Sequence, residues 1–529
     1  MSRVTTLREA AASIPDGALL TFGGFQLNRA PMALVFELIR QGRRDLRVVS
    51  PPNPLPLDLL VAAGSVAEAE FGFLGFQFED GFVVAPSVKR AIEEGALRFR
   101  ERDVYEIVQA LRAGAQGVPF LPAPGGEGSD YAGVNRTPVV DDPATGATTL
   151  IAPAVRPDVA LMHAQTADRR GNLRVDDPYA EDLLARASLR VVASAERLVD
   201  RLDHPTIPWF LVESVCEAPG GAFPTSCYRC YPHSTAHLRE YLAATTAGRA
   251  AGYMSRYVTG TPDHDAFLRA VDSPGGQGCA AAPAPGAPSG APTAADRLVV
   301  EMARCIADRD VVATGVTSAL PMLAVALARA THAPRLTYVN CVGAVDPDIR
   351  SASPSSVDPR LLDRCAGRVS LPDLFDLGRR GRIDLMFFGA AQVDALGRTN
   401  LTCIGEFARP KVKLPGPAGS SSMRPYMPKV VIAVPRHTPR SLVDRVDFCT
   451  TAASSRNRVT TVVTDKALFR LDGGRLRPVS RAAGVSVEAL RTATGFALEA
   501  GGDESAAPTR AETEALRALD PAGIRHRMI

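Results

Sequence analysis

Cysteine is scarce in this chain. Nine cysteines are spread at irregular spacings over 529 residues, too thinly for a disulfide framework, so we expect reduced thiols. The net charge is small as well, because 60 basic residues nearly balance 57 acidic ones and leave a formal net charge of +3. So small a charge does not predict nucleic acid or a membrane surface as a partner. Any anionic ligand must therefore be bound by local groups.

Long apolar runs are also missing. No uncharged stretch reaches membrane-spanning length, and the opening residues, MSRVTTLREAAASIPDG, lack the apolar core of a signal peptide. We therefore expect a cytoplasmic protein. Walker, HExxH and GxSxG motifs are absent too, which removes the commonest sequence signals for nucleotide, zinc-protease and serine-hydrolase sites.

The composition that remains is that of an ordinary globular enzyme, 46% hydrophobic and 22% charged. The length exceeds what one hydrophobic core supports and predicts roughly two to four domains. One segment, SPGGQGCAAAPAPGAPSGAPT, is almost entirely Ser, Pro, Gly and Ala, and buries too little apolar surface to offset the entropy of ordering it. It predicts a flexible linker over residues 273–294, between domains 1–272 and 295–529.

The pattern of apolar runs is the same on both sides of this linker. Each half opens with a helix, a buried strand, a glycine turn with a nearby proline, a second helix and a second strand. This repetition predicts two related α/β domains with open parallel sheets. The helices and strands of the first half are expected at 5–14, 18–22, 32–40 and 46–50, and those of the second at 298–307, 311–315, 321–331 and 336–339. Later strands are expected at 159–164, 189–194, 383–388, 430–434 and 459–464, with a helix at 103–113 and a surface excursion at 125–149.

The most informative thiol is Cys341. It ends the run Leu336-Thr-Tyr-Val-Asn-Cys341 and precedes a turn at Gly343, which predicts a strand with the thiol at its end, next to Asn340. Ligands of open α/β sheets bind at that edge, beside the carboxyl ends of the strands. The alternative is that Cys341 is a buried small hydrophobe, as most free cysteines are.

Other candidate binding groups also follow predicted strands. The turn Gly23-Gly24-Phe25 could present backbone N–H groups to an anion, and Asn28 and Arg29 follow closely enough to share that pocket and clamp a carboxylate. Such turns are also needed for packing alone, and Arg29 could equally be solvated at a helix start. In the second half, three polar residues of a turn-rich segment suit hydrogen bonding to an amide-containing ligand or, equally, turn capping: Gln392, Asp394 and Asn400.

A metal site is not expected. Cys227 and Cys230 have the spacing of half a zinc site, with His233 and His237 nearby, but no second ligand pair follows at a usual distance. His163 lies in an apolar strand, where a core histidine with satisfied hydrogen bonds is the more common case. We also expect no permanently bound cofactor.

Taken together, the two halves resemble the A and B subunits of the glutaconate CoA-transferase type of family I CoA transferases. The A-like motifs include GGFQLNRAPMALVFELIRQGRRDL and ALRAGAQGVPFLP, and the B-like motifs include HAPRLTYVNCVGAVDP, FFGAAQVDALGRTNLTCIG and RPKVKLPGPAG. The resemblance implies a pair of open NagB/RpiA-like α/β sheets with the active site between them. It also implies acyl-CoA as a substrate, coenzyme A as substrate or product, an acyl acceptor as second partner, and a possible homodimer.

The sequence departs from that family where the chemistry is expected. The family's catalytic glutamate, in a Glu-x-Gly setting, corresponds to Cys341 here. The family's GxGxP turn corresponds to residues 317–321, with both glycines replaced and Ala319 at the second, and Arg398 stands where the family usually has asparagine. Related steroid-ring-opening hydrolases place a glutamate on the A-like half; the nearest position is Val104, with Glu106 two residues on.

A cysteine in place of the glutamate changes what stays on the enzyme. A thiolate that attacks a thioester retains the acyl group, so the main hypothesis is acyl transfer through an acyl-Cys341 thioester, with a partner base such as His163, His233 or His332. One alternative is a hydrolase acting on a thioester or C–C bond with Glu106 or Asp103 as base. Others are conventional CoA transfer through another carboxylate such as Glu406, and an inactive acyl-CoA binder.

Overall fold

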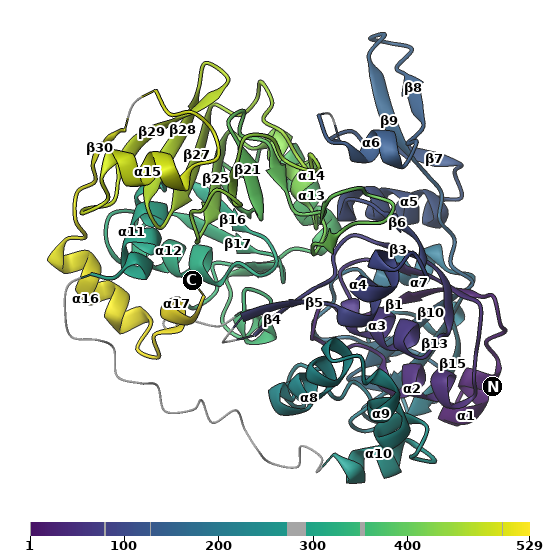
Figure 1. The fold of residues 1–529 in the computed structure, drawn as a ribbon. Helices are drawn as coiled ribbons and strands as arrows, with labels where there is room; N and C mark the ends of the chain where they lie inside the picture. Colours follow the sequence, from purple (N-terminus) through teal and green to yellow (C-terminus); the bar gives the residue numbers. More distant parts are fainter. Residues whose placement is uncertain are drawn as a thin grey trace.

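The structure is a computed structural model that describes residues 2–78, 81–126, 128–271, 292–349, 355–499 and 501–528. Two α/β units lie side by side, one built by each half of the chain (Figure 1). Each unit is organised around one large open sheet. The two α/β sheets predicted from the sequence are therefore present.

The first half contains a seven-stranded sheet in the order β15-β13-β10-β1-β2-β3-β6, in which every pair is parallel. Its strands are β1 (Leu19–Phe22), β2 (Leu46–Ser50), β3 (Val66–Phe71), β6 (Arg98–Glu101), β10 (Val159–Ala164), β13 (Arg190–Ala195) and β15 (Val212–Glu217). Its main helices are α1 (Leu7–Ala12), α2 (Met32–Arg40), α3 (Pro54–Ala62), α4 (Pro86–Glu93), α5 (Val104–Gln116), α7 (Glu181–Ala187), α8 (Thr235–Thr246) and α10 (His264–Ala270).

The second half contains a ten-stranded sheet in the order β19-β18-β17-β16-β20-β25-β27-β28-β29-β30. The five strands β17, β16, β20, β25 and β27 are parallel, as predicted, whereas β18, β19, β28 and β29 extend the sheet with antiparallel pairs. The strands are β16 (Val311–Thr314), β17 (Thr337–Asn340), β18 (Ala344–Val345), β19 (Gly367–Arg368), β20 (Leu385–Gly389), β25 (Lys429–Val434), β27 (Val459–Thr464), β28 (Ala467–Asp472), β29 (Arg475–Arg481) and β30 (Asp503–Glu504). The helices are α11 (Ala294–Arg304), α12 (Ala319–Ala330), α13 (Leu371–Arg379), α14 (Ser420–Met423), α15 (Val487–Ala493), α16 (Arg510–Leu519) and α17 (Ile524–Arg527).

The central elements follow directly from apolar composition. All six residues of β10 are buried, as a parallel strand covered on both faces requires. Helix α2 buries eight of its nine residues, and its observed bounds are the predicted ones. The helix expected at 103–113 continues to Gln116 and ends where Gly117 takes the left-handed conformation, with φ +72°.

The surface excursion expected from the sequence is not a simple loop. The surface excursion at 125–149 contains α6 (Tyr131–Val134) and β8 (Val139–Asp141), which pairs with β9 (Thr148–Pro153) beside β7 (Phe120–Pro122). This three-stranded element projects from the first half (Figure 1). Most of the linker expected at 273–294 lies outside the described residues, and α11 begins at its last residue, Ala294.

The two halves are joined by buried polar contacts at the carboxyl ends of the first sheet's strands. Lys413 Nζ lies 3.0 Å from Glu101 Oε1, and both side chains are buried. The Ser422 hydroxyl and backbone N–H both donate to the Asp103 carboxylate. One hydrophobic core cluster contains residues of both halves, so the halves share a core as well as a polar seam.

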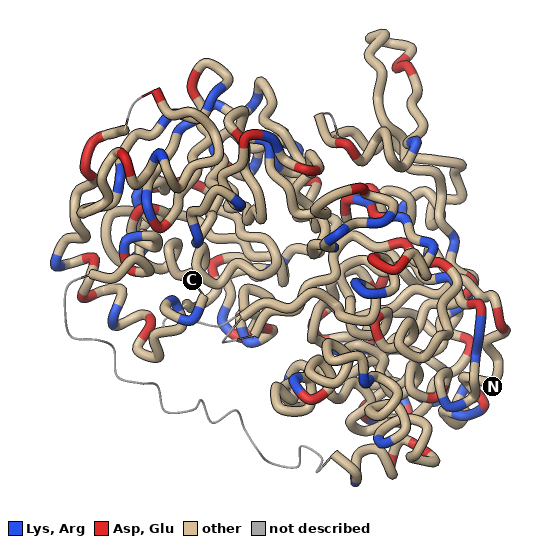
Figure 2. The backbone as a smooth tube through the Cα atoms, in the orientation of Figure 1, with Lys and Arg blue, Asp and Glu red and all other residues tan. Residues whose placement is uncertain are grey.

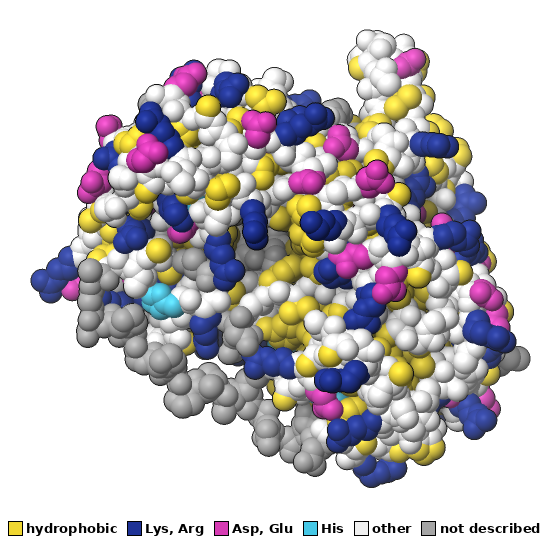
Figure 3. Space-filling model, viewed as in Figure 1, with side chains coloured by type: hydrophobic (Ala, Val, Ile, Leu, Met, Phe, Trp, Pro, Cys, Tyr) yellow, Lys and Arg dark blue, Asp and Glu magenta, His cyan; other side chains and the backbone are white. Residues whose placement is uncertain are grey.

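The surface matches the balanced composition. Lys and Arg alternate with Asp and Glu along both halves (Figure 2), and apolar side chains are visible where the halves meet (Figure 3). Among the described helices, none combines the length and the apolar character needed to cross a bilayer.

Candidate active site

Cys341 lies directly after β17, at the carboxyl end of a strand that runs inside the second sheet. The next turn requires glycine: Gly343 has φ +84°, and a Cβ there would approach the Val369 carbonyl oxygen to 2.0 Å. The thiol is 5% exposed. Its Sγ lies 3.7 Å from the Ser356 carbonyl oxygen and 4.0 Å from the Ser356 hydroxyl. The strand end and its turn are thus those expected from the sequence.

Burial raises the pKa of the Cys341 thiol to about 12, and the hydrogen bond with Ser356 opposes that rise. The group is therefore a neutral thiol at pH 7. Among the described residues, both polar atoms hydrogen-bonded to Sγ belong to Ser356, and neither is a base. Of the histidines considered as partner bases, His332 instead bonds through Nε2 to the Ile306 carbonyl oxygen, at 3.1 Å.

Ser356 links the thiol to the turn that precedes α12. Its hydroxyl accepts a hydrogen bond from the Ser318 backbone N–H at 3.0 Å and donates one to the Gly315 carbonyl oxygen at 2.9 Å. Helix α12 begins at the buried Ala319, and no side chain caps it. The partial positive charge of a helix N-terminus therefore lies close to Cys341 through one intervening hydroxyl. Sequence reasoning did not identify Ser356, because a serine in a loop gives no signal of its own.

Thr317 has a backbone conformation that favours glycine. Its φ of +54° lies in the left-handed region, which favours glycine, although the residue here is threonine. The turn between β16 and α12 therefore retains a glycine-like shape at the first of the two replaced glycine positions.

The first half brings Phe25 and Asn28 to the same place. Asn28 Nδ2 donates to the Val357 carbonyl oxygen at 2.7 Å, across the boundary between the halves. The Phe25 ring stacks on Tyr179, with ring centroids 4.7 Å apart. Because Val357 follows Ser356, these two candidates lie beside the segment that contacts Cys341. Tyr179 was not identified from the sequence, because it lies far from both motifs along the chain.

Arg29 and the glycine turn hold the protein's own carboxylates. The fully buried Arg29 guanidinium forms ion pairs with Asp177, at 2.7 Å, and with Glu181. The Gly24 backbone N–H donates to Glu181 Oε1 at 2.9 Å, and the Gly23 N–H donates to the Leu161 carbonyl oxygen. Burial acts to raise the pKa of Glu181, but Arg29 outweighs it and the pKa is lowered. This carboxylate is therefore a permanent anion at the turn.

Glu106 occupies the first turn of α5, on the seam between the halves. Burial raises its pKa to about 7, although Arg102 lies 3.4 Å away. Asp103, at the N-cap of the same helix, has its pKa raised to about 6 by burial, against its hydrogen bonds with Ser422. A cavity of about 20 Å³ adjoins both carboxyls. No hydrogen bond or ion pair of the described residues joins either carboxyl to Cys341.

The polar side chains of the turn-rich segment in the second half bind to neighbouring side chains. Asn400 Nδ2 donates to Gln392 Oε1 at 2.8 Å, and Gln392 Nε2 donates to Asp447 at 2.7 Å. Asp394 forms a 2.7 Å ion pair with Arg398, the residue at the family's usual asparagine position. These groups bind one another rather than lying open, and Glu406 lies on the exposed loop that follows.

A cavity of about 550 Å³ lies between the halves, next to the Cys341 turn. Val342 and Val369 form part of its wall on one side and Tyr179 on the other. Three arginines also line it: Arg112, Arg186 and Arg368. Aspartates line the same cavity, and Arg112 and Arg186 are paired with carboxylates, so the wall carries charges of both signs. An elongated ligand could bind with one end beside the turn that carries the thiol.

Comparison with known proteins places both halves in one family. Residues 4–218 and 296–492 match the coenzyme A transferase family. The two subunits of the 3-oxoadipate CoA-transferase of Pseudomonas knackmussii match separate parts of the chain. One is 31% identical over 281 residues (50% of this chain, 97% of that subunit). The other is 31% identical over 218 residues (38% of this chain, 84% of that subunit).

Other relatives match the chain over about half of its length. The cholesterol ring-cleaving hydrolase IpdA subunit of Mycobacterium tuberculosis is 34% identical over 275 residues (49% of this chain, 93% of that protein). An uncharacterized protein of Archaeoglobus fulgidus is 33% identical over 283 residues, and this chain spans only 63% of its length.

Two of the similar solved structures match different shares of the chain. A variant of the decarboxylase AibA/AibB is 47% identical over 48% of this chain and 98% of that chain, with a TM-score of 0.47. The acyl-CoA transferase YdiF of E. coli O157:H7, in a thioester complex with CoA, covers 99% of this chain and 97% of its own at 15% identity, with a TM-score of 0.71. This second likeness is one of fold, and it extends over both halves.

Proposed function

This chain is a member of the coenzyme A transferase family, and from that premise we propose that it is an acyl-CoA-dependent acyltransferase in which Cys341 carries the acyl group. The observation that carries the proposal is the position of the thiol. It lies at the carboxyl end of a parallel strand, beside an uncapped helix N-terminus and at the junction of the halves. This is the edge of an open α/β sheet at which ligands bind.

The first half-reaction exchanges one thiol for another. Cys341 Sγ attacks the thioester carbonyl carbon, the bond from that carbon to the coenzyme A sulfur breaks, and the acyl group remains on Sγ. The proton of the Cys341 thiol ends on the released coenzyme A thiol, so atoms and charge balance. A nucleophilic acceptor then attacks the acyl-Cys341 thioester and regenerates the thiol.

Backbone dipoles near the thiol support the tetrahedral intermediate. The turn before α12 directs the N-terminal end of that helix towards Ser356, which contacts Sγ. An oxyanion that forms beside Sγ would be stabilised by these partial positive charges. The raised pKa of Cys341 disfavours the thiolate at pH 7, so the thiol must lose its proton as it attacks.

The 550 Å³ cavity gives the substrate a place next to this turn. Arg368 on its wall suits a phosphate group of coenzyme A, since a guanidinium binds phosphate through paired donors. Phe25 and Asn28 would close the other side of the reacting group. The Gly23-Gly24 turn and Arg29 would hold this wall in place.

Intact-mass measurement tests the proposal. Protein incubated with a panel of acyl-CoAs should gain the mass of one acyl group, and Cys341→Ala should gain none. Cys403→Ala is the matched control, because Cys403 is a buried cysteine of the same half whose pKa is likewise raised to about 12. An adduct that persists in Cys341→Ala would overturn the proposal. Turnover that leaves no acyl adduct on the protein and gives products lighter by carbon dioxide would also overturn it.

Hydrolysis is the second candidate, supported by Glu106. Its Oε1 is buried with no hydrogen-bond partner among the described residues, and its raised pKa suits a general base near pH 7. Product formed from acyl-CoA and water alone, lost in Glu106→Gln and retained in Cys341→Ala, would favour this reaction over acyl transfer.

A further inference from the structure

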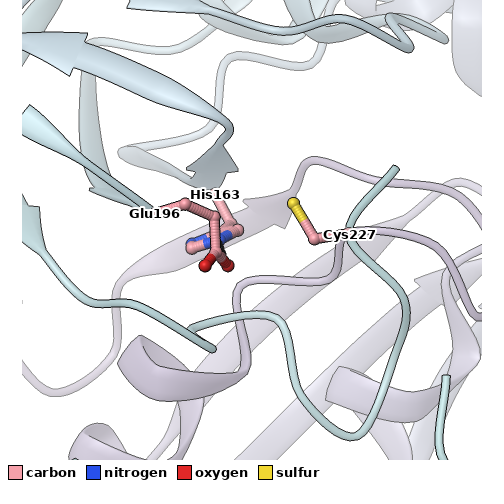
Figure 4. Close-up of side chains that lie close together, drawn as sticks. All are labelled: His163, Glu196 and Cys227. Carbon is pink, nitrogen blue, oxygen red and sulfur yellow. Dashed lines mark hydrogen bonds and ion pairs between the residues drawn. The ribbon is translucent and has the colours of Figure 1, made fainter. Parts of the chain in front are cut away.

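A second cluster of reactive side chains lies in the first half, apart from the groups around Cys341. His163 belongs to β10, Glu196 follows β13, and Cys227 lies in the loop beyond β15. One ligand atom of each lies within 4.8 Å of those of the other two, and Figure 4 shows His163 against Glu196 with Cys227 beside them. Elements distant in sequence therefore bring a nitrogen, an oxygen and a sulfur ligand together.

Cys230 lies in the same turn as Cys227, outside the group of ligand atoms that lie within 4.8 Å of one another. The turn Cys227-Tyr-Arg-Cys230 is closed by a 2.9 Å hydrogen bond from the Cys230 N–H to the Cys227 carbonyl oxygen, with Arg229 at φ +63°. Cys230 is exposed, whereas Cys227 is buried. Two cysteines separated by two residues are a usual pair of zinc ligands. The exposed member also gives solvent access to the cluster.

Neighbouring groups orient the histidine and the glutamate. Ser194 Oγ lies 2.8 Å from His163 Nδ1, which directs Nε2 towards Glu196 Oε1 at 2.7 Å. Glu196 also accepts hydrogen bonds from the Tyr231 hydroxyl at 2.6 Å and from the Gly220 N–H at 2.8 Å. Metal-binding histidines and carboxylates in proteins are held in this way by partners outside the ligand set.

We propose that His163, Glu196 and Cys227 form a binding site for one zinc-like transition-metal ion, and that Cys230 of the same turn becomes the fourth ligand when its exposed side chain turns inward. One imidazole, one carboxylate and two thiolates make a tetrahedral set that suits zinc, whereas magnesium and calcium take oxygen ligands. The ion would lie between His163 Nε2 and Glu196 and replace their direct hydrogen bond. Cys227 and Cys230 would each release a thiol proton to solvent on binding.

The role of such a site is structural. The ion would fasten the loop of Cys227 and Cys230 to the carboxyl ends of β10 and β13. The Ser226 hydroxyl, next to Cys227 in the chain, donates to Asn28 Oδ1 at 2.8 Å. Metal binding would thus stiffen the wall on which Asn28 sits, without taking part in the reaction.

Cobalt titration of the full chain tests the site. The protein is stripped with a chelator, kept reduced, and titrated with Co²⁺, which reports thiolate ligation by near-ultraviolet charge-transfer absorption and tetrahedral geometry by visible absorption. We expect saturation at one ion per chain and displacement by Zn²⁺. Zn²⁺ should also raise the melting temperature of the wild type, because it binds the folded chain.

Variants assign the ligands. Even outer partners of metal ligands are worth about 10–100-fold in affinity, so Cys227→Ser should weaken binding by at least about 100-fold and Ser194→Ala by about tenfold. Cys230→Ser should abolish part of the charge-transfer absorption. The control Cys305→Ser, in the second half, should bind as the wild type does. A wild type that binds no Co²⁺ while thiol counting shows Cys227 and Cys230 reduced would overturn the proposal, as would unchanged binding in Cys227→Ser.

Discussion

The end of β1 in the first half and the end of β17 in the second half both carry polar groups, and these groups are used differently. After β1, Glu181 accepts from the Gly24 N–H and pairs with Arg29, which also pairs with Asp177, and these three charged side chains are buried. After β17, the Cys341 thiol has only Ser356 as its polar partner among the described residues. Asn340 Nδ2, beside it, is buried with no hydrogen-bond partner in that part of the chain.

This difference indicates that the end of β1 stabilises the fold, whereas the end of β17 can bind a substrate. Removing one member of a buried ion pair leaves its partner charged and unsolvated, so the end of β1 is costly to alter. A neutral thiol and an unpaired amide donor leave bonding capacity for a ligand at the end of β17. The contrast predicts that mutations at the two places affect different measurements.

Cys341→Ala should have the largest effect, and it should be on catalysis. We expect kcat/KM for acyl transfer to fall by on the order of 10³-fold or more, because the covalent step is lost. The free energy of unfolding should change by less than about 2 kcal/mol, because only one sulfur atom is removed. Steady-state kinetics and urea unfolding of the same preparation measure both. Loss of stability with intact turnover would reverse the contrast.

Arg29→Met should show the opposite pattern. We expect the free energy of unfolding to fall by about 3–5 kcal/mol, because Asp177 and Glu181 lose their counter-charge in a buried site. Arg186→Met is the matched control, since Arg186 pairs with Asp182 on the surface and such pairs are worth roughly 0–1 kcal/mol. Equal unfolding midpoints for the two variants would contradict a structural role for Arg29.

Asp103 should make the seam between the halves sensitive to pH. Its folded pKa is raised to about 6, so the folded protein binds this proton more tightly than the unfolded chain does. The resulting stabilisation is present below about pH 4 and is lost as the pH rises to about 6, by up to roughly 3 kcal/mol. Urea unfolding across this range should show that slope in the wild type and a smaller one in Asp103→Asn. Asp200→Asn, at an exposed carboxyl, should leave the slope unchanged.

Alkylation of Cys341 should give the smallest and most direct signal. Because its pKa is raised to about 12, the thiolate fraction should rise about tenfold per pH unit between about pH 7 and 9. Peptide mapping after iodoacetamide treatment at each pH would report this rate. A rate that levels off near pH 7 would show that the thiol is already ionised, and would favour a stronger nucleophile than the structure indicates.

Much of the local structure could be predicted from residue patterns. The bounds of α2, β2, β10 and β27 coincide with the predicted ranges, because each is an apolar run ended by turn-forming residues. The position of Cys341 at a strand end followed in the same way from its run and Gly343. Antiparallel additions such as β28 and β29 were missed, since their alternating surface residues resemble loop sequence.

The sequence by itself therefore determined the elements, the repeated plan of the two halves and the thiol at the end of β17. The tertiary structure alone decided what the polar side chains bind. Arg29 meets Asp177 and Glu181 across 148 and 152 residues of chain, and His163 meets Glu196 and Cys227 from three separate segments. The physical reason is that apolar periodicity reports which face of an element is buried. Which polar groups then fall within bonding distance depends on how remote strands are ordered in the sheet.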